Sequence, residues 1–268
     1  MTLSHRMTTS TNMNYTDTQI SAIKELLFKI ADDELIIGHR NSEWTGLGPI
    51  LEEDIAFSSI AQDKLGQSLA FYNLLHNLGE KEPDELAFMR NENEFKSCHL
   101  VEHPNGEYDF SLVRHFLFTH AENIRFEMLA ESSFEPIAKI AKKLKGEVKY
   151  HLMHADTWLK QLGSATEESK ARIQKALDES FNLALGIFEP GDYENELAEM
   201  KVFAGEKTLR AKWIEIIKPI IESSGLKLPD ESLWKPAYGG RKGEHTEYLQ
   251  PLLDEMAEVF RIDPEAEW

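Results

Sequence analysis

The amino-acid sequence predicts an all-α fold, a bundle of long helices followed by shorter helices near the C-terminus. Apolar residues recur at steps of three and four along most of the 268 residues, which is the spacing of a helix face packed on a core. The predicted helices are long and their connections short, as in an up-and-down bundle. No linker rich in Pro, Gly and Ser and no repeat of fixed period interrupts the chain, so we expect one helical domain over residues 18–268.

The first two helices have clear boundaries. Apolar residues at helical spacing predict a first helix over residues 18–37, with Thr16 or Asp17 as its cap. A second helix is predicted over residues 52–78, because it opens on an acidic triplet that favours the positive end of a helix dipole. Gly79 is a natural end for that helix.

The later elements are shorter or separated by turns. Residues 83–95 predict a short helix, and residues 100–107 an extended piece with a tight turn at Pro104-Asn105-Gly106. The other predicted helices cover residues 109–132, 135–162, 166–186, 197–203, 206–224 and 244–260. A looped stretch with several Pro and Gly residues separates the last two.

Composition excludes several classes of partner. The hydrophobic fraction of 41% supports a sizeable core, and no apolar run approaches the roughly 20 residues that span a bilayer. A formal net charge of −18 would repel nucleic acid and anionic membranes. We therefore expect neither nucleic acid nor a membrane as partner.

The N-terminus and the single cysteine indicate the compartment. Residues 1–17 are polar and lack an apolar centre, so we expect an unstructured segment and no secretory signal. Cys98 is the only cysteine, which excludes an internal disulfide and suits a reducing cytoplasm. We expect Cys98 to be a buried free thiol, since no base stands near it in the sequence.

One helix resembles a metal-binding helix that lacks its ligands. In carboxylate-bridged di-iron bundles, a core helix carries Glu-x-x-His, which projects two ligands from one face. The corresponding register of the predicted helix 52–78 is occupied by Lys64 and Gln67. A lysine ammonium has three donors and no lone pair, so it cannot bind a metal while charged.

The predicted helix 135–162 breaks the same motif in either frame. If Glu147 is the carboxylate, Tyr150 occupies the histidine position; if His151 is the histidine, Val148 occupies the glutamate position. Glu147 and His151 still share a helix face, where they either pair inside the core or hold an adventitious metal. His151 and His154 form an i, i+3 pair that binds Zn²⁺ weakly when exposed, and we interpret it as incidental.

Two further helices offer candidates for the remaining carboxylate positions. On the predicted helix 109–132 these are His120, Glu122 and Glu127, of which Glu127 has large apolar neighbours in sequence and is a candidate for an inward position. On the first helix, Glu34 and His39 are equivalent candidates.

A lysine in such a register has two interpretations. Isolated buried charge is costly, so Lys64 would act as the counter-ion of core carboxylates in place of a metal, paired with Glu147 or Glu127. In the alternative interpretation Lys64 extends its ammonium to solvent.

Three stretches together resemble the C subunits of bacterial phenylacetyl-CoA epoxidases. They are the segment Asp32-Asp33-Glu34-Leu35-Ile36-Ile37-Gly38-His39-Arg40-Asn41-Ser42-Glu43-Trp44, the segment Leu100-Val101-Glu102-His103-Pro104-Asn105-Gly106, and the segment Gly239-Gly240-Arg241-Lys242-Gly243-Glu244-His245-Thr246-Glu247-Tyr248-Leu249. The resemblance extends from about residue 18 to the C-terminus.

The resemblance implies a ferritin-like helical bundle that pairs with a homologous, catalytic A subunit. In that family the A subunit holds the di-iron centre that epoxidises the aromatic ring, and a further subunit delivers electrons from a reductase. The C subunit is structural, so the resemblance implies no catalytic residue, cofactor or metal in this chain. We also expect the isolated chain to form a homodimer through the face that it offers to its partner.

Other interpretations stay open at this point. One is a working di-metal oxidase with an atypical ligand set, and another is a ferritin-like binding protein without a catalytic partner. The segment Gly239–Leu249 either attracts a CoA phosphate through Arg241 and Lys242 or is a glycine-shaped loop that caps a helix and docks on the partner. We favour the loop, since a CoA site belongs with the chemistry.

Overall fold

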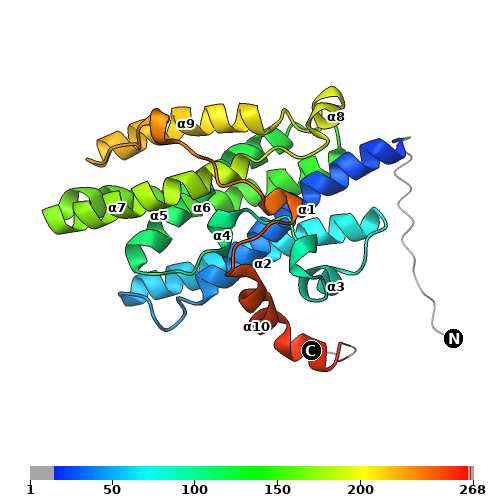
Figure 1. Cartoon of the computed structure of the whole chain (residues 1–268), viewed down its shortest axis with the longest axis horizontal. Helices are drawn as coiled ribbons and strands as arrows, with labels where there is room; N and C mark the ends of the chain where they lie inside the picture. Colours follow the sequence, from blue (N-terminus) through cyan, green and yellow to red (C-terminus); the bar gives the residue numbers. More distant parts are fainter. Residues whose placement is uncertain (1–14, 265, 267–268) are drawn as a thin grey trace.

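The computed structural model describes residues 15–264 and 266, and its regular structure is helical throughout that part of the chain. The all-α, ferritin-like bundle is therefore confirmed (Figure 1). Most of the N-terminal segment predicted to be unstructured, residues 1–14, lies outside the described residues. Asp17, placed in that segment by the sequence, is already the first residue of a helix.

The long helices form the bundle and the short ones connect it. The long helices are α1 (Asp17–Ser42), α2 (Leu51–Asn77), α5 (Tyr108–Leu129), α6 (Glu135–Ala165), α7 (Glu167–Leu185), α9 (Glu206–Ser223) and α10 (Leu249–Ile262). The short helices are α3 (Pro83–Phe88), α4 (His99–Glu102) and α8 (Glu194–Glu199). Single 3₁₀ turns occur at Glu92–Glu94, Gly186–Phe188, Glu231–Leu233 and Gly240–Lys242.

Two antiparallel helix pairs make up the central bundle. Helix α1 packs along α2, and α5 packs along α6, while α2 also contacts α6 (Figure 1). Helices α7 and α9 both contact α5 and α6 and so cover the second pair. Side chains that point inward from α1, α2, α5 and α6 therefore meet in one interior.

Local chemistry fixes the ends of the first helices. The Thr16 hydroxyl accepts a hydrogen bond from the Gln19 amide, and the Gln19 side chain accepts one from the Thr16 amide, which completes a capping box. Thr16 is therefore the cap of α1. Helix α2 ends before Gly79, whose φ of +92° is a conformation that glycine adopts without strain.

Several predicted boundaries are wrong. The first helix, predicted to end at residue 37, continues to Ser42, and the helix predicted over residues 197–203 spans Glu194–Glu199. The helix predicted over residues 83–95 ends at Phe88, because Arg90 turns inward to an aspartate of α1 and Asn91 caps a separate 3₁₀ turn. The segment predicted as extended, residues 100–107, begins inside the short helix α4. The helix predicted from residue 244 begins at Leu249, because residues 244–248 bond to α4 and to the loop before it.

The core combines a large apolar interior with buried ion pairs. Phe71, Phe116, Phe126 and Trp213 are fully buried, and the Trp213 indole donates a hydrogen bond to the Leu117 carbonyl at 3.0 Å. None of the described helices is both long and apolar enough to cross a membrane.

Candidate functional site

Lys64 lies in the centre of the bundle with no solvent-exposed surface. Its Nζ is 3.0 Å from Glu34 Oε2 on α1 and forms a second, closer salt bridge with Glu122 Oε2 on α5. A third contact, at 3.3 Å, joins Nζ to the side-chain oxygen of Gln67 one helical turn further along α2. The interpretation in which Lys64 extends to solvent is therefore wrong.

The carboxylates that meet Lys64 are not the pair expected from the sequence. Glu122 is the inward residue of α5, whereas Glu127 is exposed and contributes nothing to this site, because it projects from another side of the helix. On α1 the structure selects Glu34 over His39. Glu147 accepts a hydrogen bond from Gln67 Nε2 at 3.2 Å instead of pairing with Lys64.

The rotation of α6 decides between the two frames of its broken motif. His151 and Val148 are both fully buried, while Tyr150 is 45% exposed. The inward register is therefore Val148-x-x-His151, and the placement of Tyr150 at a core position is wrong. Glu147 is half-buried at the edge of the same face.

Lys64, Glu34 and Glu122 shift one another's pKa values. Burial and the neighbouring Glu122 raise the pKa of Glu34 to about 8, against the opposing effect of Lys64. Burial also raises the pKa of Glu122, again opposed by Lys64. The pKa of Lys64 is raised because the attraction of both carboxylates outweighs its burial. At neutral pH Glu34 is therefore mostly protonated, while Lys64 is charged.

A cluster of three buried histidines extends the polar interior along α5 and α6. His151 Nε2 lies 3.0 Å from Asp63, His154 Nε2 lies 2.9 Å from Glu53, and the His115 ring is 5.3 Å from the His154 ring between centroids. Burial and nearby cations lower the pKa of His151 to about 2, and burial lowers the pKa of His115 well below its ordinary value. Both rings are therefore neutral.

The buried histidines correct one expectation from the sequence. His151 and His154 do not form a pair on an exposed face, since both rings lie in the interior and each bonds to a different carboxylate. The motif search did not single out Glu53 or His115. Helical spacing would have identified both residues. Glu53 lies three turns before Lys64 on the same face of α2, and His115 lies two turns before Glu122 on the same face of α5.

The residues present do not fit a di-iron centre. Such a centre takes carboxylates and imidazoles from all four helices, but α2 supplies an ammonium and an amide, and α6 supplies one imidazole without its glutamate. Within residues 15–264 and 266, no group of three or more His, Cys, Asp or Glu side chains could hold a metal ion. The ammonium of Lys64 stands between the two carboxylates that remain.

Glu34 is the last of three consecutive buried acids on α1. Consecutive helical residues point about 100° apart, so each acid meets a cation from a different part of the chain. Asp32 pairs with Arg90 after α3 at 2.5 Å, Asp33 with Arg241 near the C-terminus at 2.6 Å, and Glu34 with Lys64 on α2. Each of the three carboxylates is almost completely buried.

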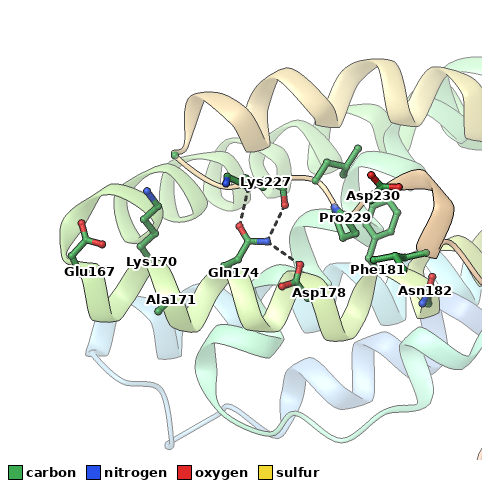
Figure 2. Close-up of a pocket in the computed structure, with 13 residues that line it drawn as sticks. Glu167, Lys170, Ala171, Gln174, Asp178, Phe181, Asn182, Lys227, Pro229 and Asp230 are labelled. Atoms are coloured by element: carbon green, nitrogen blue, oxygen red, sulfur yellow. Dashed lines mark hydrogen bonds between the residues drawn. The ribbon is translucent and has the colours of Figure 1, made fainter.

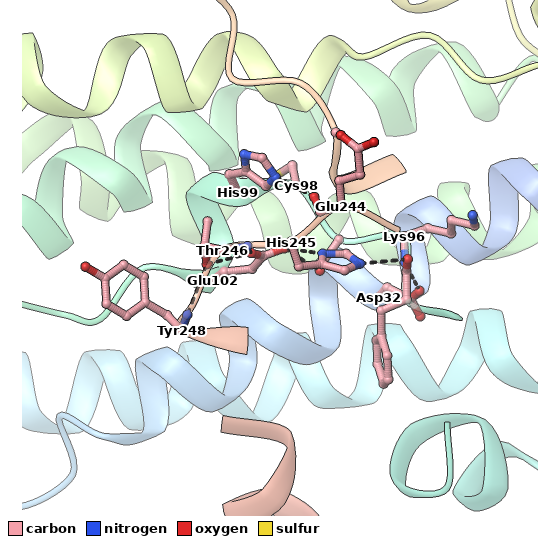
Figure 3. Close-up of polar contacts among 12 residues, drawn as sticks. Asp32, Lys96, Cys98, His99, Glu102, Glu244, His245, Thr246 and Tyr248 are labelled. Atoms are coloured by element: carbon pink, nitrogen blue, oxygen red, sulfur yellow. Dashed lines mark hydrogen bonds and ion pairs between the residues drawn. The ribbon is translucent and has the colours of Figure 1, made fainter. Parts of the chain in front are cut away.

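The segment Gly239–Leu249 docks on its own chain (Figure 3). His245 Nδ1 lies 2.7 Å from Glu102 Oε1, and the Thr246 amide donates to Glu102 Oε2 at 2.8 Å. A Cβ atom at Gly240 would clash with the Ser97 carbonyl oxygen, so only glycine permits this close approach. Because Arg241 is buried and paired with Asp33, it is not available to a CoA phosphate.

A separate hollow of about 850 Å³ lies between α7 and residues 225–233, and Figure 2 shows the residues that line it. Gln174 closes one side of it by bonding to the Lys227 backbone at 2.8 and 2.9 Å. Its rim mixes lysines with acidic residues, so it offers no charge of one sign to a ligand. None of the residues around Lys64 lines it.

Comparison with known proteins places the chain among proteins of aromatic catabolism. Residues 6–268 match the family model described as phenylacetic acid catabolic protein. The chain is 33% identical over 241 residues to the C subunit of the 1,2-phenylacetyl-CoA epoxidase of Escherichia coli K12, covering 90% of this chain and 96% of that relative. It is 22% identical over 209 residues to the A subunit of the same enzyme, covering 76% of this chain and 67% of that relative.

Proposed function

The chain belongs to the phenylacetic acid catabolic protein family, and we propose that it is the structural subunit of a phenylacetyl-CoA epoxidase complex. In this role it pairs with a catalytic partner of the A type, stabilises it and contributes no metal or catalytic residue of its own. The di-iron centre that activates O₂ belongs to that partner. The similarity to both the C and A subunits of one enzyme supports this assignment.

The observation that carries the proposal is the position of Lys64 between Glu34 and Glu122. Removal of metal ions from a bundle interior leaves carboxylates that repel one another, and buried charge without a partner is costly. A single ammonium supplies the missing positive charge. Lys64 therefore acts as a fixed counter-ion in place of a metal, and the bundle keeps its packing without the chemistry.

Iron content tests whether the centre is degenerate. The triple variant Lys64→Glu, Gln67→His and Val148→Glu restores Glu-x-x-His on α2 and on α6, where Glu34, Glu122 and His151 already point inward. Each protein is purified without an affinity tag and then reconstituted with Fe²⁺. We expect close to no iron in the wild type and bound iron in the triple variant. Two iron atoms per wild-type chain would show instead a di-metal oxidase with an atypical ligand set.

A matched control keeps the added residue types but moves them out of register. Gln62→His and Lys149→Glu place an imidazole and a carboxylate on exposed positions of the same two helices. This variant is expected to bind no more iron than the wild type. Circular dichroism and thermal unfolding of each variant confirm that the fold is retained before iron is measured.

Pairing is tested with the cognate A subunit. We expect the two purified chains to elute together in size-exclusion chromatography. Epoxidation of phenylacetyl-CoA by the A subunit with its reductase should require this chain. If, at micromolar concentration, the chain stays separate from the A subunit, it is a binding protein without that catalytic partner.

A further inference from the structure

The outward face of α2 is almost free of charge, which is unusual in a chain of formal net charge −18 with 28% charged residues. From Ile55 to the end of the helix, the exposed positions carry no Lys, Arg, Asp or Glu; they are Ile55, Ser59, Gln62, Gly66, Leu69, Asn73, His76 and Asn77. The outward face of α9, by contrast, carries several lysines and glutamates. Depletion of charge is the compositional mark of an interface core.

Large apolar side chains flank this uncharged strip. Leu47, Leu51 and Ile55 are each more than 60% exposed around the start of α2. Near the other end, Leu69 is half exposed and lines a hollow of about 760 Å³ together with Met89. We call the outward residues of α2 with Leu47 and Met89 the α2 face. Groups of large exposed apolar side chains mark sites of association.

Helix α6 widens the α2 face. The contacts of Glu53 with His154 and of Gln67 with Glu147 show that α6 runs beside α2 in the opposite direction. Tyr150 lies one turn from both Glu147 and His154, so its 45% exposed side chain adds a further large side chain to the edge of the face.

The middle of the α2 face carries no side chain at Gly66. A Cβ atom at Gly66 on α2 or at Gly146 on α6 would meet no atom within 4 Å, so neither glycine is required by packing inside this chain. Glycine is a poor helix former, and its presence in the middle of two long helices lowers their propensity. A gap of this kind lets the backbone of another helix approach closely.

Charge at the ends of the face makes a second copy of this chain a poorer occupant than a basic partner. Exposed acids predominate at both ends: Glu52 at the start of α2, and Glu82, Asp84 and Glu85 against the single Lys81 just after its end. In a two-fold contact, each end of the face meets either the same end or the opposite end of the face on the other copy. Both arrangements bring acidic residues together. A partner with basic residues around an apolar centre matches this pattern.

We propose that the α2 face is the surface on which the catalytic A-type subunit docks, through a helix that lies over Gly66 and is flanked by lysines or arginines. This inference rests on the proposed function, because that function supplies the identity of the partner. The partner helix approaches closely over Gly66, the apolar side chains at both ends are buried, and the acidic ends pair with basic residues of the partner.

The substitution Gly66→Arg tests the docking surface without damaging the fold. Arginine is a good helix former, and its side chain projects into open space in the isolated chain. We expect the melting temperature of the isolated chain to stay the same or rise, while the Kd for the cognate A subunit rises at least tenfold in calorimetry. The matched control Ile216→Arg, at an exposed apolar residue of α9, is expected to leave the Kd unchanged.

Charge reversal on this chain tests whether its acidic ends pair with basic residues of the partner. The double variant Glu82→Lys and Asp84→Lys should weaken binding to the A subunit. The wild-type Kd should also rise with salt concentration, because exposed charge pairs are screened. Reversal at Glu215 and Glu222 on α9 provides the control.

The outcomes separate this inference from the proposed function. If Gly66→Arg binds the A subunit just as well as the wild type does, the docking surface lies elsewhere and the proposed function stands. If Gly66→Arg disrupts only a homodimer, the α2 face joins two copies of this chain and the inference is wrong. If even the wild type fails to bind the A subunit, both proposals fail.

Discussion

Asp33 and Arg241 lie 208 positions apart in the sequence and form a salt bridge of 2.6 Å with both side chains almost fully buried. The pair joins the middle of α1 to the segment Gly239–Leu249 near the C-terminus. A second pair, Glu102 with His245, joins that segment to α4. The three stretches that carry the resemblance to epoxidase C subunits thus meet at one place, and their residue types follow from these contacts.

Loss of Arg241 should destabilise the protein strongly. We expect Arg241→Met to lower the free energy of unfolding by about 3–5 kcal/mol, because it leaves the buried Asp33 carboxylate without a cation, bonded only to the Cys98 amide. Urea unfolding at pH 7 provides the measurement. The neighbouring exposed residue gives the control, and Lys242→Met should change stability by less than about 0.5 kcal/mol. Equal effects of the two substitutions would contradict the importance of the pair.

Lys64 should stabilise the bundle through its charge. Lys64→Met leaves two buried carboxyl groups facing each other, so we expect the free energy of unfolding at pH 7 to fall by about 3–5 kcal/mol. Adding Glu34→Gln and Glu122→Gln removes the remaining charge and should recover most of that loss. Lys145→Met, at an exposed position of α6, is the control. Failure of the triple variant to regain stability would show that the loss reflects packing and not charge.

Glu34 should make stability fall as pH rises. Its pKa is raised to about 8 in the folded protein, so between about pH 4.3 and 8 the native state binds a proton that the unfolded state has lost. Its contribution is complete below that window and is lost as pH rises through 8. Glu34→Gln cannot ionise, so its stability relative to the wild type should increase by at most about 1.4 kcal/mol per pH unit between pH 5 and 8.

Denaturant unfolding at each pH measures that difference. Glu127→Gln, on the exposed side of α5, should show no such trend. A constant difference between Glu34→Gln and the wild type from pH 5 to 9 would show that Glu34 ionises normally.

Glu102 should act in the opposite direction. Burial would raise the pKa of Glu102, but the hydrogen bond and charge of His245 and the two donors of Thr246 together lower it. The resulting stabilisation is present above the unfolded pKa of about 4.3 and is lost as pH falls through the lower folded value. We expect Glu102→Gln to be less stable by about 1–3 kcal/mol at pH 7, with the gap closing in acid. The exposed Glu247→Gln should not differ from the wild type at either pH.

Cys98 should be unreactive in the native protein. Burial raises the pKa of its thiol well above the ordinary value, with the nearby Asp33 adding to the effect, and the thiolate is the form that reacts. A thiol reagent at pH 8 should therefore modify Cys98 only after denaturant is added. Arg241→Met, which loosens the segment packed against it, is expected to speed the reaction. Rapid labelling of the folded wild type would contradict the burial of this residue.

Sequence periodicity predicted the long helices because helix formation and amphipathic spacing are local. The start of α10 could not be predicted in this way. Residues 244–248 have an apolar and charged pattern compatible with a helix, but their backbone and side chains bond to Glu102, more than a hundred residues away. The same long-range effect interrupts the helix predicted after Pro83, where Arg90 leaves the helix to pair with Asp32.

On α2, the Glu-x-x-His spacing alone indicates which residues share one face of the helix. Lys64 and Gln67 stand on one face of α2, which their spacing of three residues predicts. The choice of Glu122 over Glu127, and the inward position of Val148 in place of Tyr150, depend on how α5 and α6 are rotated. That rotation is set by packing of whole helix faces, which a short motif does not encode.

The run Asp32-Asp33-Glu34 also constrains how the chain is made. The three cations that neutralise it are Arg90, Arg241 and Lys64, and the ribosome delivers them at widely separated times. Until Arg241 has emerged, a bundle that has already closed around α1 holds one uncompensated negative charge. A nascent chain therefore lacks a complete interior until Arg241 has left the ribosome.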